Sequence, residues 1–244
     1  MSYPWAAHLL GALTAPLHSK KKFQEPPPYP TLPNPSKSDR ILVLAPHPDD
    51  ETSLVGGYIA TACDGGAEVF VVIISDGNAQ NQKQRRFQEL KVALNMLSVP
   101  KYECLELPDG QLFNHMPHII RQIRDQVVRL KPTVIIFPHP FDQHSDHAAV
   151  GQAALKSTAE STVKRYSYPD HFPPQLPFPR RLDTKLFTWA PQAMAGNWVS
   201  FPLSAAALTK KINAVSAYRQ ELSRPILRSH LLATLRRNEI FEQH

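Results

Sequence analysis

The chain has 244 residues, a length that suits one α/β domain of up to ~250 residues with additional segments at its ends. Its hydrophobic content of 42% with 20% charged residues is typical of a globular protein, and no apolar run reaches the ~18 to 20 residues of a membrane-spanning helix, so wholesale disorder and an integral membrane class are excluded. The formal net charge of +6 comes from scattered cations, which argues against a nucleic-acid partner, and two cysteines are too few for a disulfide scaffold and favour a reducing cytoplasm.

Residues 1–38 are predicted to form an N-terminal arm with a proline-rich linker, followed by one domain over residues 39–244. Prolines concentrate between residues 26 and 35, as in a semi-rigid spacer. The arm carries an apolar stretch, Trp5 to Leu17, followed by Lys20 to Lys22; because the cations follow the apolar stretch, a secretory signal is rejected. A peripheral contact of residues 5–22 with an anionic membrane, packing on the domain, and disorder remain alternatives. We therefore expect a cytoplasmic protein, membrane-associated if the arm binds lipid.

Short β-branched runs alternate with helical patterns along the rest of the chain. Strands are predicted over 41–45, 69–74, 102–107 and 134–137, with two further strands over 185–189 and 198–201. Amphipathic helices are predicted after Gln84 and after Met116, and two more helices over 205–222 and 225–237. This rhythm predicts an α/β fold with a mostly parallel sheet flanked by helices.

Two polar clusters follow predicted strands. The first strand is followed by Pro46 to Glu51, with the sequence PHPDDE, and the fourth by Pro138 to His147, with the sequence PHPFDQHSDH. Ligands of open α/β sheets bind beyond the carboxyl ends of the strands, so both clusters are expected at one rim.

A hydrolytic metal site uses three protein ligands and leaves one position open. His47, Asp50 and His147 are suited to this role, because His47 and Asp50 are three residues apart on a turn leading into a helix. Asp49 then points elsewhere and is available to act on a bound water. The alternative is a solvated turn with a helix cap. His139 is expected to support the site or the fold, and His115, His118 and His171 are given no role.

These residues resemble the signature of the PIG-L/LmbE-type zinc-dependent N-deacetylases. The first motif is similar over Ala45 to Glu51 with Gly56 and Gly57, and the second over His144 to His147. Shorter matches extend the resemblance over residues 40–241: Ser75-Asp76-Gly77, Arg86, Glu89, Ala93, Leu97-Ser98-Val99 and Pro108-Asp109-Gly110. Ser75 and Ser98 depart from the residues that are frequent there, and residues 1–38 have no counterpart.

The resemblance implies a Rossmann-like, LmbE-like fold and removal of an N-acetyl group from an N-acetylglucosamine-type sugar or glycoconjugate. It implies Zn²⁺, with Fe²⁺ as another divalent candidate, held by His47, Asp50 and His147. It also implies that Asp49 is the general base of a zinc-activated water, and that His144 stabilises the oxyanion or protonates the departing amine. Asp146 is expected to orient His144. Arg86 and Asp109 are expected to bind sugar hydroxyls, the alternative being an exposed helix charge and a turn aspartate.

Two other classes compete with this interpretation. A non-catalytic sugar-binding or interaction protein on the same fold would be expected to have lost a ligand or the base, whereas every proposed position is filled here. A non-haem iron enzyme uses the same ligand types but usually an all-β scaffold. The sequence leaves the individual substrate and the oligomeric state open.

Overall fold

The computed structural model describes residues 29–78, 81–171 and 196–244. The described strands are β1 (Arg40–Ala45), β2 (Glu68–Ser75), β3 (Lys101–Leu107), β4 (Val134–Pro138), β5 (Lys164–Tyr168), β6 (Asn197–Pro202) and β7 (Asn238–Gln243). The described helices are α2 (Asp50–Asp64), α3 (Lys83–Met96), α4 (Met116–Leu130), α5 (Ser145–Ser157), α6 (Ala205–Val215), α7 (Arg219–Ser223) and α8 (Pro225–Ala233), with a 3₁₀ turn, η1, at Leu112–His115.

The strands form one sheet in the order β3-β2-β1-β4-β5-β7-β6. The strands from β3 to β5 run parallel to one another, and β7 pairs antiparallel with both β5 and β6. The mostly parallel, Rossmann-like sheet predicted from the sequence is confirmed. The chain order reverses between β1 and β4, and the carboxyl ends of these two strands therefore flank the crevice where such sheets bind ligands.

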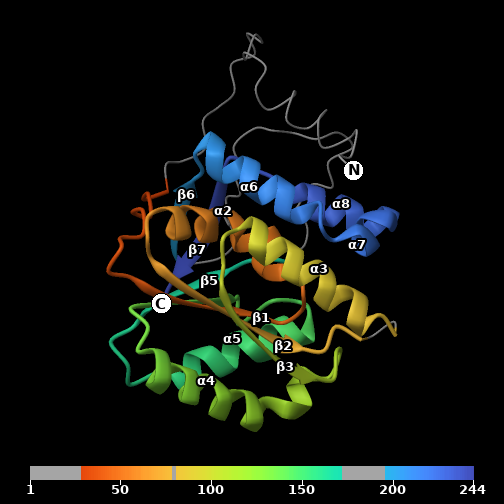
Figure 1. Cartoon of the computed structure of the whole chain (residues 1–244). Coiled ribbons are helices and arrows are strands. Elements are labelled where there is room, and N and C mark those ends of the chain that lie inside the picture. Colours follow the sequence, from red (N-terminus) through yellow and green to blue (C-terminus); the bar gives the residue numbers. More distant parts are fainter. Residues whose placement is uncertain (1–28, 79–80, 172–195) are drawn as a thin grey trace.

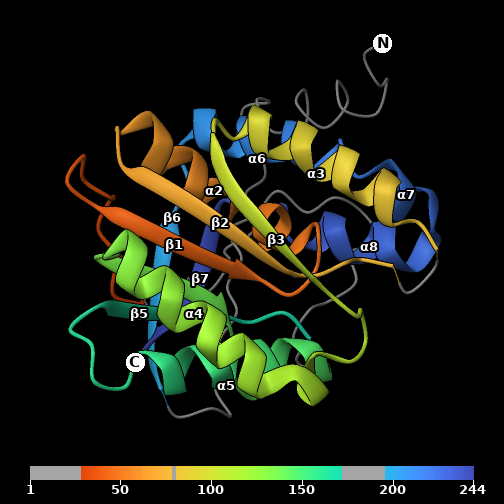
Figure 2. The same cartoon turned by 60° about the horizontal axis from the view of Figure 1, so that its bottom comes forward.

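Helices cover both faces of the sheet (Figures 1 and 2). One layer contains α2, α3 and α6, with α7 and α8 beside them, and the other contains α4 and α5. β1 lies in the middle of this sandwich: Ile41 and Val43 face the first layer, while Leu42 and Leu44 face the second. A strand buried on both faces needs an apolar residue at every position, which explains the unbroken run of β1.

Most predicted elements are present, but two predicted helices end at other residues and two strands were not predicted. The helix predicted over 205–222 is split into α6 and α7, because the chain turns at Ser216 to Tyr218 and buries the Tyr218 side chain. The helix predicted over 225–237 ends at Ala233, and β5 and β7 were not predicted at all. The strand predicted over 185–189 lies outside the described residues.

Part of the proline-rich linker packs on the sheet. The Leu32 N–H donates to Ser200 O at 2.8 Å, the Ser200 N–H donates to Pro30 O at 2.9 Å, and the Leu32 side chain is 6% exposed. The packed chain therefore extends to the N-terminal side of the boundary expected at residue 38. The apolar stretch Trp5 to Leu17 and Lys20 to Lys22 lie outside the described residues. Among the described helices, none is both long and apolar enough to cross a membrane.

Candidate metal centre

The turn between β1 and α2 brings His47 and Asp50 together. The Asp50 carboxylate accepts a hydrogen bond from the His47 N–H at 2.9 Å, which closes the turn. The same oxygen, Asp50 Oδ2, lies 3.3 Å from His47 Nδ1. The three-residue spacing seen in the sequence thus places both side chains at the first turn of α2.

The loop after β4 supplies the other histidines. His144 caps α5, with its Nδ1 accepting from the Asp146 N–H at 3.2 Å, and His147 follows in the first turn. α5 approaches the end of β4 closely at Gly151, where a Cβ atom would lie 2.3 Å from Pro138 O. A glycine at this position therefore allows the helix to carry His147 to the rim of the sheet.

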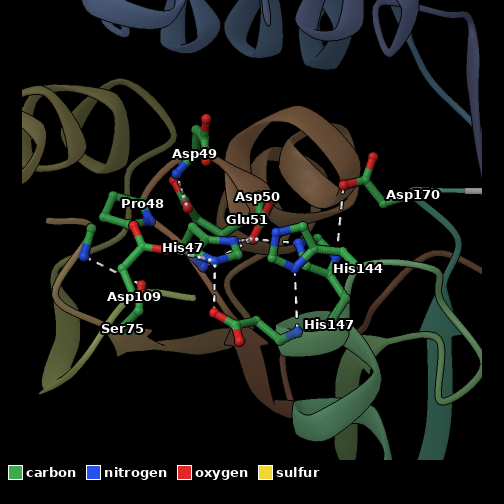
Figure 3. A network of polar contacts seen from close by, with 12 residues as sticks. His47, Pro48, Asp49, Asp50, Glu51, Ser75, Asp109, His144, His147 and Asp170 are labelled. Carbon is green, nitrogen blue, oxygen red and sulfur yellow. Dashed lines mark hydrogen bonds and ion pairs between the residues drawn. The ribbon is translucent and has the colours of Figure 1, made fainter. Parts of the chain in front are cut away.

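His47, Asp50 and His147 form a cluster with one candidate ligand atom each (Figure 3). Asp50 Oδ2 lies 3.3 Å from both His47 Nδ1 and His147 Nε2. Ligand atoms about 2.0–2.1 Å from a tetrahedral zinc ion are about 3.3 Å apart, so this spacing fits. The buried His147 Nε2 forms no aligned hydrogen bond within the part of the chain that is described. A histidine nitrogen that lies close to a carboxylate oxygen without an aligned hydrogen bond fits a site in which both atoms bind one cation.

The second nitrogen of His47 is held by carboxylates. His47 Nε2 lies 3.2 Å from Asp146 Oδ2 and 3.3 Å from Asp109 Oδ1. Asp146 is itself fixed by the Gly110 and Leu112 N–H groups, at 2.8 and 3.0 Å. The expectation that the Asp146 carboxylate orients His144 is therefore corrected: the carboxylate contacts His47, and only the Asp146 main chain bonds to His144.

The carboxylates and histidines perturb each other. Burial alone would lower the pKa of His47, but its contacts with Asp109, Asp146 and Asp50 raise that pKa well above its usual value. Burial would raise the pKa of Asp50, but His147 and His47 hold that pKa well below its usual value. Positive charge at this position is therefore strongly favoured, as a cation site requires.

Asp49 is not among the candidate ligands of the described residues, and its carboxylate lies 3.3 Å from Arg86. Its backbone has φ 130°, a conformation that costs a non-glycine residue about 1–3 kcal/mol and is often found at functional sites. The Asp49 N–H donates to Glu51 Oε2 at 3.1 Å, which holds this conformation. Burial raises the pKa of the Asp49 carboxylate well above its usual value, and the Arg86 charge opposes that rise.

Arg86 lies on α3 and contacts protein carboxylates. Its guanidinium is 3.3 Å from Asp49 Oδ1, 3.1 Å from Glu221 Oε1 and 3.7 Å from Asp109 Oδ2, and it donates to Pro48 O at 2.9 Å. The exposed-charge alternative is wrong, because the Arg86 side chain is only 15% exposed. Asp109 is also buried, at 8%. Both residues lie at the site, and Arg86 is placed to hold Asp49.

His144 lies among the other histidines of the rim. Its ring centroid is 5.0 Å from that of His47 and 5.1 Å from that of His147. Burial and the nearby imidazoles lower the pKa of His144. His139 is separate from this group: it lies 2.7 Å from Glu242 and stacks on Trp198, as expected for a histidine that supports the fold.

Sequence reasoning missed part of the rim. The sequence assigns no role to His171, yet its Nδ1 lies 3.0 Å from Asp170 and 3.4 Å from Asp142. His230, from α8, lies 2.7 Å from Asp170. The position of Asp170 and His171 directly after β5 was the available signal, but β5 itself was not predicted.

Parts of this chain are similar to known deacetylases. Residues 42–158 match a family model described as "PIG-L: GlcNAc-PI de-N-acetylase". The chain is 24% identical over 147 residues to a diacetylchitobiose deacetylase from Thermococcus kodakarensis, a match that covers 54% of this chain and 53% of that relative. The chain thus spans about half the length of this curated relative. These matches confirm the resemblance to the PIG-L/LmbE-type deacetylases.

Solved structures show the same fold. The antimicrobial reagent A40926 pseudoaglycone deacetylase Dbv21 superimposes with a TM-score of 0.68 at 21% identity, covering 84% of this chain and 96% of that one. GalB, a 4-carboxy-2-hydroxymuconate hydratase from Pseudomonas putida, has a TM-score of 0.58 at 18% identity and covers 81% and 82% of the two chains. Proteins with this fold therefore catalyse more than one reaction, so function has to be inferred from the site residues.

Proposed function

We propose that this chain, with its PIG-L match and LmbE-like fold, is a metal-dependent N-deacetylase of an N-acetylglucosamine-type sugar or glycoconjugate. The observation that carries the proposal is the cluster of His47, Asp50 and His147, with Asp50 Oδ2 3.3 Å from a nitrogen of each histidine and Asp49 adjacent in sequence. The acetamido sugar is proposed from the family description and the archaeal relative.

Two imidazoles and one carboxylate suit Zn²⁺, and Fe²⁺ shares this preference. A zinc ion held by these residues would polarise the acetyl carbonyl and lower the pKa of a water. His47 would bind through Nδ1, because its Nε2 faces Asp146 and Asp109. His147 would bind through Nε2, with Nδ1 facing Asp142 at 3.9 Å and Asp170 at 3.7 Å. Carboxylates behind ligand histidines fix their orientation.

Asp49 is the proposed general base. It accepts the proton of the water that attacks the acetyl carbon, and its burial raises its pKa and so strengthens it as a base. When the C–N bond breaks, the same carboxyl returns the proton to the amine nitrogen. The products are the free amino sugar and acetic acid, which ionises in solution.

His144 is the proposed donor to the oxyanion. Its Nδ1 accepts a hydrogen bond from the Asp146 N–H, so the neutral ring carries its proton on Nε2. That N–H is available for the carbonyl oxygen as negative charge develops there. This arrangement favours the oxyanion role over the alternative role of proton donor to the amine.

Substrate selection is proposed for Asp109 and Arg86. Asp109 lies beside His47 and Arg86, and its carboxylate would accept hydrogen bonds from sugar hydroxyls. Arg86 would help to form the same wall of the site while it neutralises Asp49. A lipid-linked sugar remains one substrate option, through the proposed membrane contact of residues 5–22.

The experiment is to measure acetate release from a panel of N-acetylglucosaminides with the purified, metal-loaded protein. His147→Ala tests the ligand set, and His118→Ala, on α4, is the matched control. We expect the control to retain metal and turnover and His147→Ala to lose both. Sugar binding without any acetate release across the panel would favour the non-catalytic alternative, and full zinc content in His147→Ala would contradict the ligand set.

A further inference from the structure

A second histidine and carboxylate cluster lies beside the first. Asp170 and His171 follow β5 directly, and His230 comes from α8, close to the C-terminal end of the chain. His230 Nε2 lies 2.7 Å from Asp170 Oδ1, and His171 Nδ1 lies 3.0 Å from Asp170 Oδ2. One ligand atom from each of the three residues lies within 4.8 Å of the others.

These close contacts are not aligned hydrogen bonds. Asp170 Oδ1 and His171 Nδ1 are both buried atoms that form no hydrogen bond of acceptable geometry in the described ranges. His147 Nε2 has the same property beside Asp50 in the first cluster. Ligand atoms that lie close together without an aligned hydrogen bond between them are compatible with a cation bound between them.

The burial of the second cluster fits a bound ion that remains open to solvent. The Asp170 side chain is 1% exposed, whereas His171 is 38% exposed and His230 is 22% exposed. A buried carboxylate needs a positive partner. The two partly exposed imidazoles are able to open the cluster by the few tenths of an ångström that separate its contacts from the ~3.3 Å spacing of tetrahedral ligands.

We propose that Asp170, His171 and His230 bind a second divalent transition-metal ion. Two imidazoles and one carboxylate select zinc-like ions rather than Mg²⁺ or Ca²⁺, which prefer oxygen ligands. The two clusters meet at His147, whose Nε2 lies 3.3 Å from Asp50 and whose Nδ1 lies 3.7 Å from Asp170. The inference extends beyond the proposed deacetylase, because the second cluster shares no ligand with the proposed catalytic ion.

The second ion should bind more weakly than the first. His171 and His230 already lie 3.0 and 2.7 Å from Asp170, and both contacts must lengthen when a metal binds. Their partial exposure also leaves the imidazoles less constrained than His47 and His147, which are buried or nearly so. Titration with metal should therefore separate two binding steps.

The test measures bound Zn²⁺ per chain by elemental analysis while free Zn²⁺ is varied, starting from protein stripped of metal. The wild-type chain should bind two equivalents with separable affinities, and Co²⁺ absorption should report two nitrogen-containing sites. His230→Gln keeps a donor to Asp170 but removes a strong ligand, and it should lose only the weaker equivalent. His47→Ala should lose only the tighter one, and His118→Ala should keep both.

Thermal unfolding of the metal-free variants checks that each one folds, and His171→Asn is a second route to the same loss if His230→Gln does not fold. Two results would overturn the proposal: a wild-type chain that saturates at one equivalent, or a folded His230→Gln that still binds two. Two equivalents in the wild-type chain, neither of which is lost in His47→Ala, would count against the proposed catalytic ion and leave the second site standing.

Discussion

Asp146 Oδ2 lies 3.2 Å from His47 Nε2, so a carboxylate of the second motif supports a histidine of the first. Two backbone N–H groups, from Gly110 and Leu112, hold that carboxylate in place. Burial would raise the pKa of Asp146, but His47 and these two N–H groups keep that pKa below the usual value. The pair of Asp146 and His47 ties the ends of β1 and β4 together. It also fixes which nitrogen of His47 is left for a metal.

Asp146→Asn should therefore weaken metal binding. Loss of a carboxylate behind a ligand histidine typically costs about 10–100-fold in metal affinity. Competition with a chelator of known affinity would measure the change. Asp125→Asn, an exposed change on α4, is the control. Unchanged affinity with reduced turnover would instead indicate that Asp146 acts only on chemistry.

Asp49→Asn should preserve metal content and lower turnover by about 100-fold or more, because the amide cannot accept the proton. Asn is isosteric, and it tolerates unusual backbone conformations better than most residues, so the φ of 130° at this position should be kept. Acetate release at saturating substrate would measure the loss. Wild-type turnover in this variant would remove Asp49 from the mechanism.

Arg86→Ala should lower kcat by about tenfold or more, since the side chain holds Asp49 at 3.3 Å and is mostly buried. A residue that only bound sugar hydroxyls would raise KM and leave kcat unchanged. Arg85→Ala is the matched control, because Arg85 is next in sequence, is 56% exposed and pairs with Glu89 one turn further along α3. The kcat and KM values of both variants decide between the two roles.

Two deletions of the arm should have different results, depending on the residue at which each deletion ends. Removal of residues 1–28 should leave the fold and the deacetylation of a soluble sugar intact. Removal of residues 1–35 also takes away Leu32, which is 6% exposed, and should cost about 1.5–3 kcal/mol for that buried side chain. Denaturant unfolding of the two truncated proteins would compare their free energies of unfolding. A lipid-linked substrate that gains nothing from residues 1–28 would end the membrane proposal.

Lys211→Met should destabilise the fold strongly. Lys211 Nζ lies 2.7 Å from Glu239 Oε1 and both side chains are buried. The change leaves the Glu239 carboxylate hydrogen-bonded to the Gly57 and Tyr58 N–H groups but without its cation, at a cost of about 3–5 kcal/mol. The matched control is Lys210→Met, whose partner Asp64 is exposed and whose loss should cost no more than about 1 kcal/mol. Equal unfolding free energies would contradict this account.

The sequence by itself determined the parallel half of the sheet and the first cluster. β1, β2 and β4 are encoded by apolar runs, β3 by apolar residues interspersed with charged ones, and α3 and α4 by helical periodicity, which are all local signals. His47 and Asp50 are three residues apart, so one turn places them together whatever the rest of the chain does. The shared direction of parallel strands then places His147 at the same rim.

Only the tertiary structure decided which side chains meet across long separations. Asp146 contacts His47, which is 99 residues away in the sequence, and Arg86 contacts Asp49, which is 37 residues away. His230 reaches Asp170 because α6 to α8 pack over the sheet and β7 returns antiparallel beside β5. The periodicity of a sequence indicates which face of a helix or strand is buried. It does not indicate which other element that face contacts, because that contact depends on the packing of the whole core.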